Sequence, residues 1–378
     1  MANTLTNLIP DIYAALDVVS LELVGFVPAV TLDPQAARGA IGQTLRSAVT
    51  PAAEASDIVP GVTPPDDGDQ VIGNQALTIT KSRRVPVRWN GEQTLGINSG
   101  LGYLTVRQQQ FAQAMRRLIN ELEADLAALY VRASRAYGTA GLTPFATAGD
   151  YSDSAAVRQI LVDNGAPISD LQLVINSRAG TSLRAKQAQA QMAGDTSLLR
   201  QGVLFDLSGF AVRESAQIRG HVKGTAAAYV VNNGAGYAVG DTVIAVDGGA
   251  GTLLAGDVIT FAGDPHQYVV GTALAGGSLT LSAPGLRQAL VDGTAVTLVN
   301  GYAANMAFSR SAIVAGVRLP ALPEEGDMAD DRMTITDARS GIALEVSLYR
   351  QYRQIQYEIS LAWGVACVKP EHLAILMG

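Results

Sequence analysis

The side chains best suited to chemistry are few and far apart in this chain. It contains three histidines, His221, His266 and His372, and a single cysteine, Cys367. No histidine has a second ligand at a metal-binding spacing such as His-x-x-x-His, and one thiol excludes both a disulfide framework and a cysteine-based metal cluster. We therefore expect the histidines at surface or turn positions and Cys367 as a small core residue.

Catalytic and cofactor motifs are also missing. The sequence has no GxSxG elbow, no P-loop and no GxGxxG motif after a strand. The glycines Gly234, Gly236 and Gly240 are out of register for a nucleotide loop. The Asp-Gly pairs lack the alternating carboxylates of a calcium loop, so hairpin turns explain them better. We predict no catalytic, cofactor-binding or metal-binding residues, and hence a structural protein that is not an enzyme.

The composition suits a chain whose surface is largely covered by protein. The 378 residues suffice for two or three domains; 48% are hydrophobic and only 16% are charged. Such a chain must bury surface in its core or against other subunits. The net charge of −7 argues against a dedicated nucleic-acid reader. Without a signal peptide or an apolar run of roughly 18–20 residues, we expect a soluble protein made in a cytoplasm.

The element that positions the rest is a long helix predicted over Thr105–Tyr137. Apolar residues recur at steps of three and four from Phe111 to Ala133, which is the pattern of one helix face. Thr105 and Gln108 fit a capping box. At 1.5 Å per residue, the helix would be roughly 45–50 Å long. It is either a long core helix of a globular enzyme or a spine that spans more than one layer.

Residues 50–100 lack a helical period and indicate an extended loop. Strands are predicted near Ala76–Lys81 and Val85–Trp89, and Asn90-Gly91 is a strong two-residue hairpin signal. The charges here fit a solvated hairpin, or a protruding arm whose arginines contact carboxylates of another subunit. The residues predicted at subunit interfaces are Phe26, Arg83, Arg84, Arg88, Trp89 and Glu92, together with Glu324, Glu325 and Asp327 of an acidic loop.

The remaining segments differ in character. Residues 1–48 predict an arm whose apolar side chains need a partner, on the same chain or on a neighbour. Residues 221–300 are rich in glycine and have turn signals every eight to twelve residues, which indicates a small all-β domain inserted into an α+β one. Near the C-terminus, Ile355–Trp363 alternates apolar and polar residues. That pattern predicts a half-buried antiparallel strand whose apolar face packs on the long helix.

The order of these parts, and the residues at both ends, resemble a known family. The arm opens Met1-Ala-Asn-Thr-Leu-Thr-Asn-Leu-Ile-Pro10 and leads into Glu22-Leu-Val-Gly-Phe-Val-Pro28. The C-terminal part contains Ile335-Thr-Asp-Ala-Arg-Ser-Gly-Ile-Ala-Leu344 and Trp363-Gly-Val-Ala366. The chain is similar to the major capsid (coat) proteins of tailed double-stranded-DNA phages, most of all to the subgroup of phage P-twenty-two, which carries an inserted β-barrel.

The resemblance implies a fold and a division into parts. The fold is the α+β capsid fold named after phage Hong Kong ninety-seven, with a spine helix packed on an antiparallel sheet. The implied parts are an N-arm (1–49), an extended loop or β-hairpin (50–100), a peripheral domain (101–144 and 321–378), an axial domain (145–220 and 301–320) and an inserted β-barrel domain (221–300).

The resemblance also implies a function in the virion. Copies of the protein would self-assemble as pentamers and hexamers, through many weak contacts, into an icosahedral capsid. That shell would enclose double-stranded DNA without sequence-specific binding, would include a portal protein, and would need no membrane. No additional scaffold region precedes the arm, so a separate scaffolding protein is the expected partner. The alternatives are a cellular nanocompartment shell, a secreted β-rich adhesion or sugar-binding protein, and an enzyme without recognisable motifs.

Overall fold

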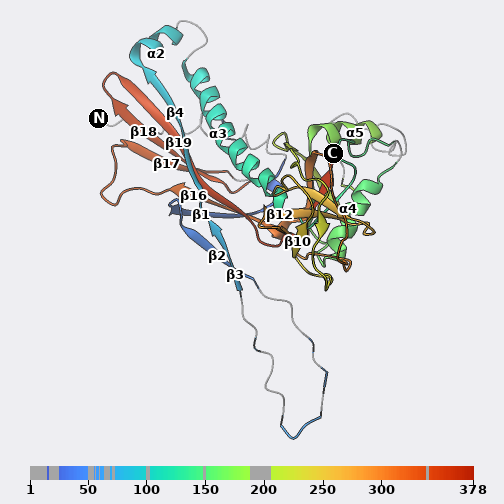
Figure 1. Cartoon of the computed structure of the whole chain (residues 1–378). Helices are drawn as coiled ribbons and strands as arrows, with labels where there is room; N and C mark the ends of the chain where they lie inside the picture. Colours follow the sequence, from blue (N-terminus) through green and yellow to red (C-terminus); the bar gives the residue numbers. More distant parts are fainter. Residues whose placement is uncertain are drawn as a thin grey trace.

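A long helix lies along one sheet, and a second sheet adjoins the end of that helix (Figure 1). The computed structural model is mixed α/β, as the sequence predicts. It describes residues 15–16, 25–49, 55, 57–58, 60–63, 69, 73–98, 103–147, 150–187, 206–337 and 340–378. None of the helices in these ranges combines the length and apolar character that crossing a membrane requires.

The first sheet has the strand order β1-β16-β19-β18-β17, and β4 pairs with β19 as well. β1 runs parallel to β16, and every other pairing is antiparallel. Its strands are β1 (Thr31–Gly39), β4 (Lys81–Asn90), β16 (Ile313–Pro320), β17 (Asp331–Thr336), β18 (Ala343–Gln351) and β19 (Gln354–Cys367). Because β4 and β16 share one edge of β19, residues far apart in sequence form one surface.

The second sheet combines two parts of the chain. Its order is β7-β6-β15-β20-β5-β12-β13-β10-β9, with β8, β11 and β14 attached at the side. β5 joins the two parts, because it pairs with β20 on one edge and with β12 on the other. The strands are β5 (Arg135–Tyr137), β6 (Leu171–Ile175), β7 (Phe210–Glu214), β8 (Gly220–His221), β9 (Val230–Val231), β10 (Val243–Asp247), β11 (Val258–Phe261), β12 (Gln267–Ala275), β13 (Ser278–Leu281), β14 (Val296–Leu298), β15 (Tyr302–Ser309) and β20 (Leu373–Met377).

The long helix is shorter than predicted. α3 spans Tyr103–Ala127, so its 25 residues measure about 38 Å. Thr105 and Gln108 lie inside it, and the predicted capping box is therefore wrong. Beyond Ala127, the chain forms the 3₁₀ helix η3 (Ala128–Arg132) and then β5. Pairing with two other strands draws Arg135–Tyr137 out of the helix, an effect that helical periodicity cannot anticipate.

The predicted hairpin turn at Asn90-Gly91 is also wrong. These residues begin the helix α2 (Gly91–Asn98). Asn90 Oδ1 accepts a hydrogen bond from the Gln93 N–H at 2.7 Å, and Gln93 Oε1 accepts one from the Asn90 N–H at 3.1 Å, which is a reciprocal capping box. The hairpin is formed instead by β2 (Thr44–Val49) and β3 (Gly73–Thr78), which pair along their full length.

The remaining helices cover the second sheet. They are α4 (Ser152–Asp163) and α5 (Ser177–Gln187), with the short 3₁₀ helices η2 (Val27–Ala29), η4 (Arg310–Ala312) and η5 (Pro370–His372) elsewhere. Part of the exposed helix predicted at Ser182–Met192 lies outside the described residues. So does most of the short helix predicted near Ala15 and Leu16, although these two residues are helical and buried.

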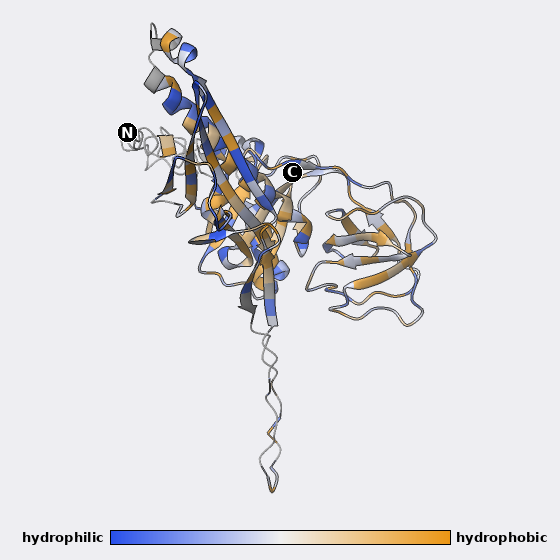
Figure 2. Ribbon diagram, turned by 90° about the vertical axis from the view of Figure 1, so that its left-hand side faces the viewer, coloured by the Kyte–Doolittle hydropathy of each residue, from blue (hydrophilic) through white to orange (hydrophobic). Residues whose placement is uncertain are grey.

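The main core lies between α3 and the first sheet. The Phe111 ring meets the Tyr357 ring edge-on, with centroids 5.3 Å apart, and Trp363 of β19 is fully buried. The predicted packing of the alternating strand on the long helix is therefore confirmed. Residues 226–298 enclose a separate cluster of buried side chains around Ile259 and Tyr268. Figure 2 shows these strands as a lobe beside the body, with hydrophobic residues along its strands.

Candidate assembly surfaces

Alternating charged side chains connect β4 to α3. Lys81 donates to Asp125 at 2.7 Å, and Arg83 lies 3.6 Å from Glu121. Two residues of a strand span about 6.8 Å and four residues of a helix about 6.0 Å, so alternate strand residues can meet every fourth helix residue. Asp125 also accepts a hydrogen bond from Trp363 Nε1 at 2.8 Å. These contacts fix the strand and the helix to one another.

The arginines of β4 have partners in their own chain. Arg84 lies 2.6 Å from Glu358 of β19, and Arg83 pairs with Glu121 as above. Neither arginine therefore needs another subunit to provide a carboxylate. Their side chains nevertheless remain 60% and 58% exposed, and Arg88 is exposed as well. A contact with a neighbouring subunit thus stays a prediction for this strand.

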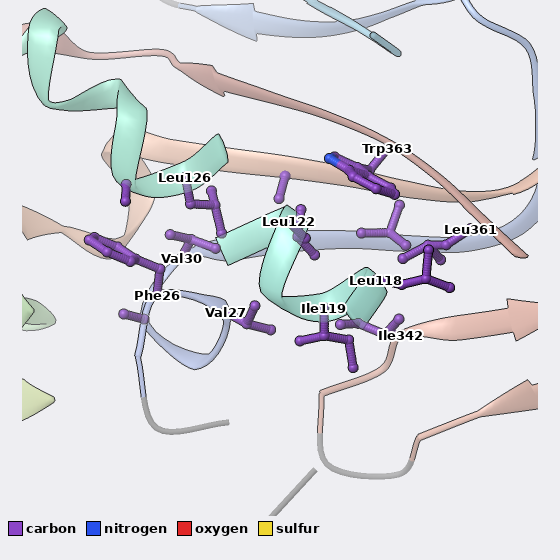
Figure 3. Packing of buried hydrophobic residues seen from close by; sticks show 14 of the residues in the cluster. Phe26, Val27, Val30, Leu118, Ile119, Leu122, Leu126, Ile342, Leu361 and Trp363 are labelled. Atoms are coloured by element: carbon purple, nitrogen blue, oxygen red, sulfur yellow. The ribbon is translucent and has the colours of Figure 1, made fainter. Parts of the chain in front are cut away.

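Two residues predicted at an interface are buried in the subunit. Phe26 is fully buried and stacks on Phe308, with ring centroids 6.4 Å apart. Trp89 is 8% exposed and donates from Nε1 to Gln110 of α3 at 2.8 Å. Both side chains thus have apolar partners within the subunit, on α3 and the second sheet, and a contact with a neighbouring subunit stays a prediction for them. Figure 3 shows Phe26, Val27 and Val30 beside the apolar face of α3.

A buried carboxylate holds this segment of the arm. Glu123 of α3 accepts hydrogen bonds from Ser215 Oγ at 2.9 Å and from the Val27 N–H at 3.5 Å. Burial raises the pKa of Glu123, and the hydrogen bonds from Ser215, Val27 and Phe26 oppose that rise. Gly25 leaves the space for this contact, because a Cβ there would lie 2.7 Å from Glu123 Oε1.

The acidic loop that contains Glu324, Glu325 and Asp327 makes only some of its contacts within its own subunit. Asp327 forms an ion pair with Arg332 and accepts a hydrogen bond from the Tyr349 hydroxyl at 3.1 Å. Glu324 and Glu325 are exposed, as is Glu92 in the first turn of α2. Of the acidic residues predicted at interfaces, these three are therefore open to solvent in the subunit.

The β2–β3 hairpin crosses the first sheet over three glycines, which we call the glycine crossing: Gly39, Gly316 and Gly364. A Cβ at Gly364 would lie 2.1 Å from the Thr78 carbonyl oxygen, and one at Gly316 would lie 2.7 Å from Leu77 Cδ2. At Gly364 the close neighbour is backbone, so only glycine allows this approach, whereas at Gly316 the neighbours are ends of leucine side chains. The crossing anchors β3 on β16 and β19, and Figure 1 shows the hairpin leaving the body there.

The loop that joins β2 to β3 carries exposed apolar groups and negative charge. Ile58 is 97% exposed and Val62 is 105% exposed. Residues 50–72 contain five acidic and no basic residues. Nothing in the described part of the subunit covers Ile58 or Val62. Among the described residues of this loop, Ile58, Val62, Asp57 and Asp69 are therefore open to solvent.

Exposed arginines lie on both faces of β4 and on the neighbouring α3, because successive residues of a strand point to opposite faces. We call this set the cationic strip and define it by Arg83, Arg84, Arg88 and Arg117. Arg117 is 70% exposed and pairs with Glu121, whose side chain is only 25% exposed. Glu358, the partner of Arg84, is 15% exposed. In each of these ion pairs the arginine is more exposed than its carboxylate partner.

The free edge of β4 is protected against strand addition. Pro86 lies opposite Glu358 in the ladder with β19 and has no N–H to offer. Arg84 and Arg88 lie two residues before and two residues after it. Proline and charge on an edge strand are the usual means of preventing uncontrolled strand pairing. A partner of the strip would therefore contact side chains rather than extend the sheet.

Two histidines are buried, which corrects the expectation of surface positions. His221 Nε2 bonds Asp257 Oδ1 and its Nδ1 bonds the Tyr130 hydroxyl, both at 2.8 Å. His372 is 6% exposed, and burial lowers its pKa. Cys367 is buried as predicted, and burial raises the pKa of its thiol to about 12. Within the described residues, no group of three possible metal ligands occurs.

No family model and no curated protein sequence matches this chain. Among solved structures, the chain is similar to one of Mycobacterium phage Che8, with TM-score 0.47 and 13% identity over 89% of this chain and 84% of the other. It is similar to the capsid of Cyanophage P-SCSP1u, with TM-score 0.49 and 12% identity over 94% and 88%. A third is a virus-like particle from Pyrococcus furiosus, with TM-score 0.44 and 10% identity over 97% and 98%. At these values the likenesses decide neither the family nor the function of the chain.

Proposed function

We propose that this chain is the major capsid protein of a tailed double-stranded-DNA phage. The observation that carries the proposal is the loop between β2 and β3, where Ile58 and Val62 are fully exposed. Apolar side chains gain free energy when a partner covers them, and a loop anchored by only two strands can reach such a partner. The resemblance of both chain ends to capsid proteins supports this function.

The charge of the subunit favours a particular contact between copies. The segment 50–72 is acidic and the cationic strip is basic, so the two segments have complementary charge. Complementary charge speeds association and fixes register more than it adds affinity. We infer that the loop of one copy contacts the strip of the next. Such weak contacts, repeated around a closed shell, give durability through their number.

The further partners follow from this function. Copies in pentamers and hexamers would form an icosahedral shell of the Hong Kong ninety-seven fold, assembled on a separate scaffolding protein and closed around a portal protein. The net charge of −7 suits a shell that encloses DNA without binding its sequence.

Reversing charge on both sides tests the loop contact. We expect Arg84→Glu with Arg88→Glu to reduce shell formation at least tenfold, and Asp66→Arg with Asp67→Arg to do the same. Combining all four changes should restore part of the yield. Shell formation is measured by size-exclusion chromatography and negative-stain electron microscopy. Asp247→Arg, at an exposed position on β10, is the matched control and should assemble normally.

Different outcomes address the contact and the function separately. Normal shells from both charge-reversed variants would reject the loop contact and leave the capsid function standing. A wild-type chain that stays monomeric with a scaffolding protein would reject the function itself. Particles that enclose protein cargo, without DNA or a portal, would instead identify a nanocompartment shell.

A further inference from the structure

An apolar groove lies at the end of the first sheet where β18 turns back into β19. Its volume is about 530 Å³, and its described lining comes from the end of β4, from α2 and from the β18–β19 turn. Trp89 of β4, Leu95 of α2 and Ile355 of β19 are among the lining residues. Leu95 is 76% exposed, and Figure 1 shows α2 beyond the end of β4 at the top of the view. The groove therefore has an apolar lining of which Leu95 is open to solvent.

The turn that borders the groove consists of two residues that a hairpin turn does not favour. Gln351 pairs with Gln354, so Tyr352 and Arg353 form the turn. Arg353 has a φ of 56°, in the left-handed region that favours glycine. Tyr352 is 88% exposed, and the Arg353 guanidinium lies over its ring, 5.8 Å from the ring centroid. Glycine would serve the turn better, and backbone strain of this kind is typical of positions where side chains meet a partner.

The charged residues that line the groove are cations. Arg350 and Arg353 belong to the lining, and none of the described lining residues carries a carboxylate. Arg350 pairs with Asp330 of its own chain, at 3.4 Å. Arg353 is exposed and has no carboxylate partner among the described residues. An acidic partner would therefore be attracted to Arg353.

The acidic loop before β17 has the complementary character. Residues 321–330 contain four acidic and no basic residues. Glu324 and Glu325 are exposed and have no cationic partner within the described chain. Met328, in the same loop, is 90% exposed, so it does not fill the groove of its own subunit. A methionine side chain adapts to irregular apolar surfaces and contacts aromatic rings favourably. The loop thus combines an uncovered apolar group with unpaired carboxylates.

The groove and the acidic loop lie at opposite edges of the same end of the sheet. β4, which leads into α2, pairs with β19, whereas β17, which follows the acidic loop, pairs with β18. At this end Asn90 lies opposite Gln354, and Asp331 lies opposite Leu348. One subunit can therefore offer its loop to one neighbour and its groove to another, which is a heterologous contact.

We propose that the acidic loop of a second copy docks in this groove. Met328 of that copy would cover Leu95, and Glu324 or Glu325 would pair with Arg353. The inference rests on the proposed capsid function, and it gives the acidic loop a contact separate from that of residues 50–72. Because the contact is heterologous, it would join successive copies around a closed ring.

Cysteine cross-linking in assembled shells tests the contact. Full-length Met328→Cys and Leu95→Cys chains are mixed, assembled and mildly oxidised; the native Cys367 is buried. A disulfide forms only when the two Cα atoms come within about 7 Å of each other. We expect disulfide-linked dimers from the mixture and none from either variant alone. Well-formed shells without mixed dimers, or dimers from Met328→Cys chains alone, would overturn the contact and leave the capsid function standing.

Charge variants of the mixed chains test the role of Arg353. Adding Arg353→Glu to the Leu95→Cys chain should lower the dimer yield at least tenfold, and Glu324→Arg with Glu325→Arg in the other chain should restore part of it. Arg178→Glu, at an exposed position on α5, is the matched control and should leave the yield unchanged.

A glycine variant separates the contact from the fold of the turn. Arg353→Gly relieves the left-handed backbone, so the melting temperature of the isolated subunit should not fall, yet the dimer yield should drop as it does in Arg353→Glu. A wild-type dimer yield from Arg353→Gly would overturn the pairing. A wild-type chain that forms no shells would reject the capsid function, and this contact with it.

Discussion

Two buried carboxylates, those of Glu123 and Asp257, connect segments of this subunit that are far apart in the sequence. Glu123 connects α3 to the arm through Val27 and to the second sheet through Ser215. Asp257 is fully buried and accepts from His221 and from the backbone of Gly224. In both cases the acceptor satisfies donors from distant segments. Removing it would leave those donors buried and unpaired.

Glu123→Gln should change how stability depends on pH. The folded pKa of Glu123 is raised above its ordinary value of 4.5, so its contribution to stability is full below that value and is lost as pH rises through the folded pKa. Glutamine keeps an acceptor but cannot ionise. The free energy of unfolding of the variant, measured in urea from pH 4 to pH 8, should therefore increase relative to wild type as pH rises. Parallel pH profiles would contradict this.

Asp257→Ala should destabilise the inserted strands strongly. It removes the acceptor of His221 Nε2 and of the Gly224 and Leu254 N–H groups. Leaving such donors buried should reduce the free energy of unfolding by about 3 kcal/mol. Denaturant unfolding measures this loss. Asp247→Ala, at an exposed position in the same lobe, should change stability by less than about 0.5 kcal/mol.

At the scale of elements, two close approaches determine where the projecting hairpin lies. The contacts from Lys81 and Arg83 hold β4 against α3. β3 precedes β4 in the chain, and its last residue, Thr78, contacts Gly364 of β19. The first contact depends on the matched rise of strand and helix, and the second on the absence of a side chain. Together they position the base of the loop that we propose contacts a neighbour.

Gly364→Ala should detach the hairpin from the sheet. The added Cβ would lie 2.1 Å from a backbone oxygen, so the hairpin must move rather than a flexible side chain. Hydrogen exchange should accelerate at Thr44–Val49 and Gly73–Thr78, and the overpacking should cost about 1–3 kcal/mol. Gly96→Ala in α2 meets no atom within 4 Å and should leave exchange at the hairpin unchanged. Unchanged protection in Gly364→Ala would show that the crossing is not needed.

At the scale of the whole molecule, charge is separated along the chain. The loop at 50–72 has a net charge of −5, since it has five acidic and no basic residues, whereas in each ion pair of the cationic strip the arginine is more exposed than its carboxylate partner. The inserted strands have their own buried cluster and join the body mainly through β5. The inserted strands thus form a part of the subunit with a core of its own.

Assembly should slow as salt increases. The Debye length falls from about 10 Å at 0.1 M to about 3 Å at 1 M, so the attraction between the loop and the strip would be screened. Light scattering after addition of scaffolding protein should show a lower initial rate at high salt, and Arg84→Glu with Arg88→Glu should flatten that dependence. A rate that rises with salt would indicate that apolar contacts control assembly.

The sequence alone determined the local elements of this protein. The apolar stripe of α3 and the strands at Leu171–Ile175, Val258–Phe261 and Ile355–Trp363 agree with the structure. The half-buried alternation of the last strand does not extend past Ile359, because Ser360 and Ala362 are buried as well. Each of these elements is set by side-chain periodicity over a few turns or residues. The same holds for the burial of Cys367 in an apolar strand. The local pattern was sufficient to predict these elements, because the residues that are buried together lie on one face of a single element.

Only the tertiary structure decided which partners those elements meet. It assigned Asn90-Gly91 to a helix cap, placed Arg135–Tyr137 in a strand that pairs with two others, and buried Phe26 and His221. It also gave Arg83 and Arg84 carboxylates from their own chain. These outcomes depend on groups that are far away in the sequence. Packing and the pairing of buried polar atoms bring those groups together, and no local periodicity of the sequence encodes these contacts.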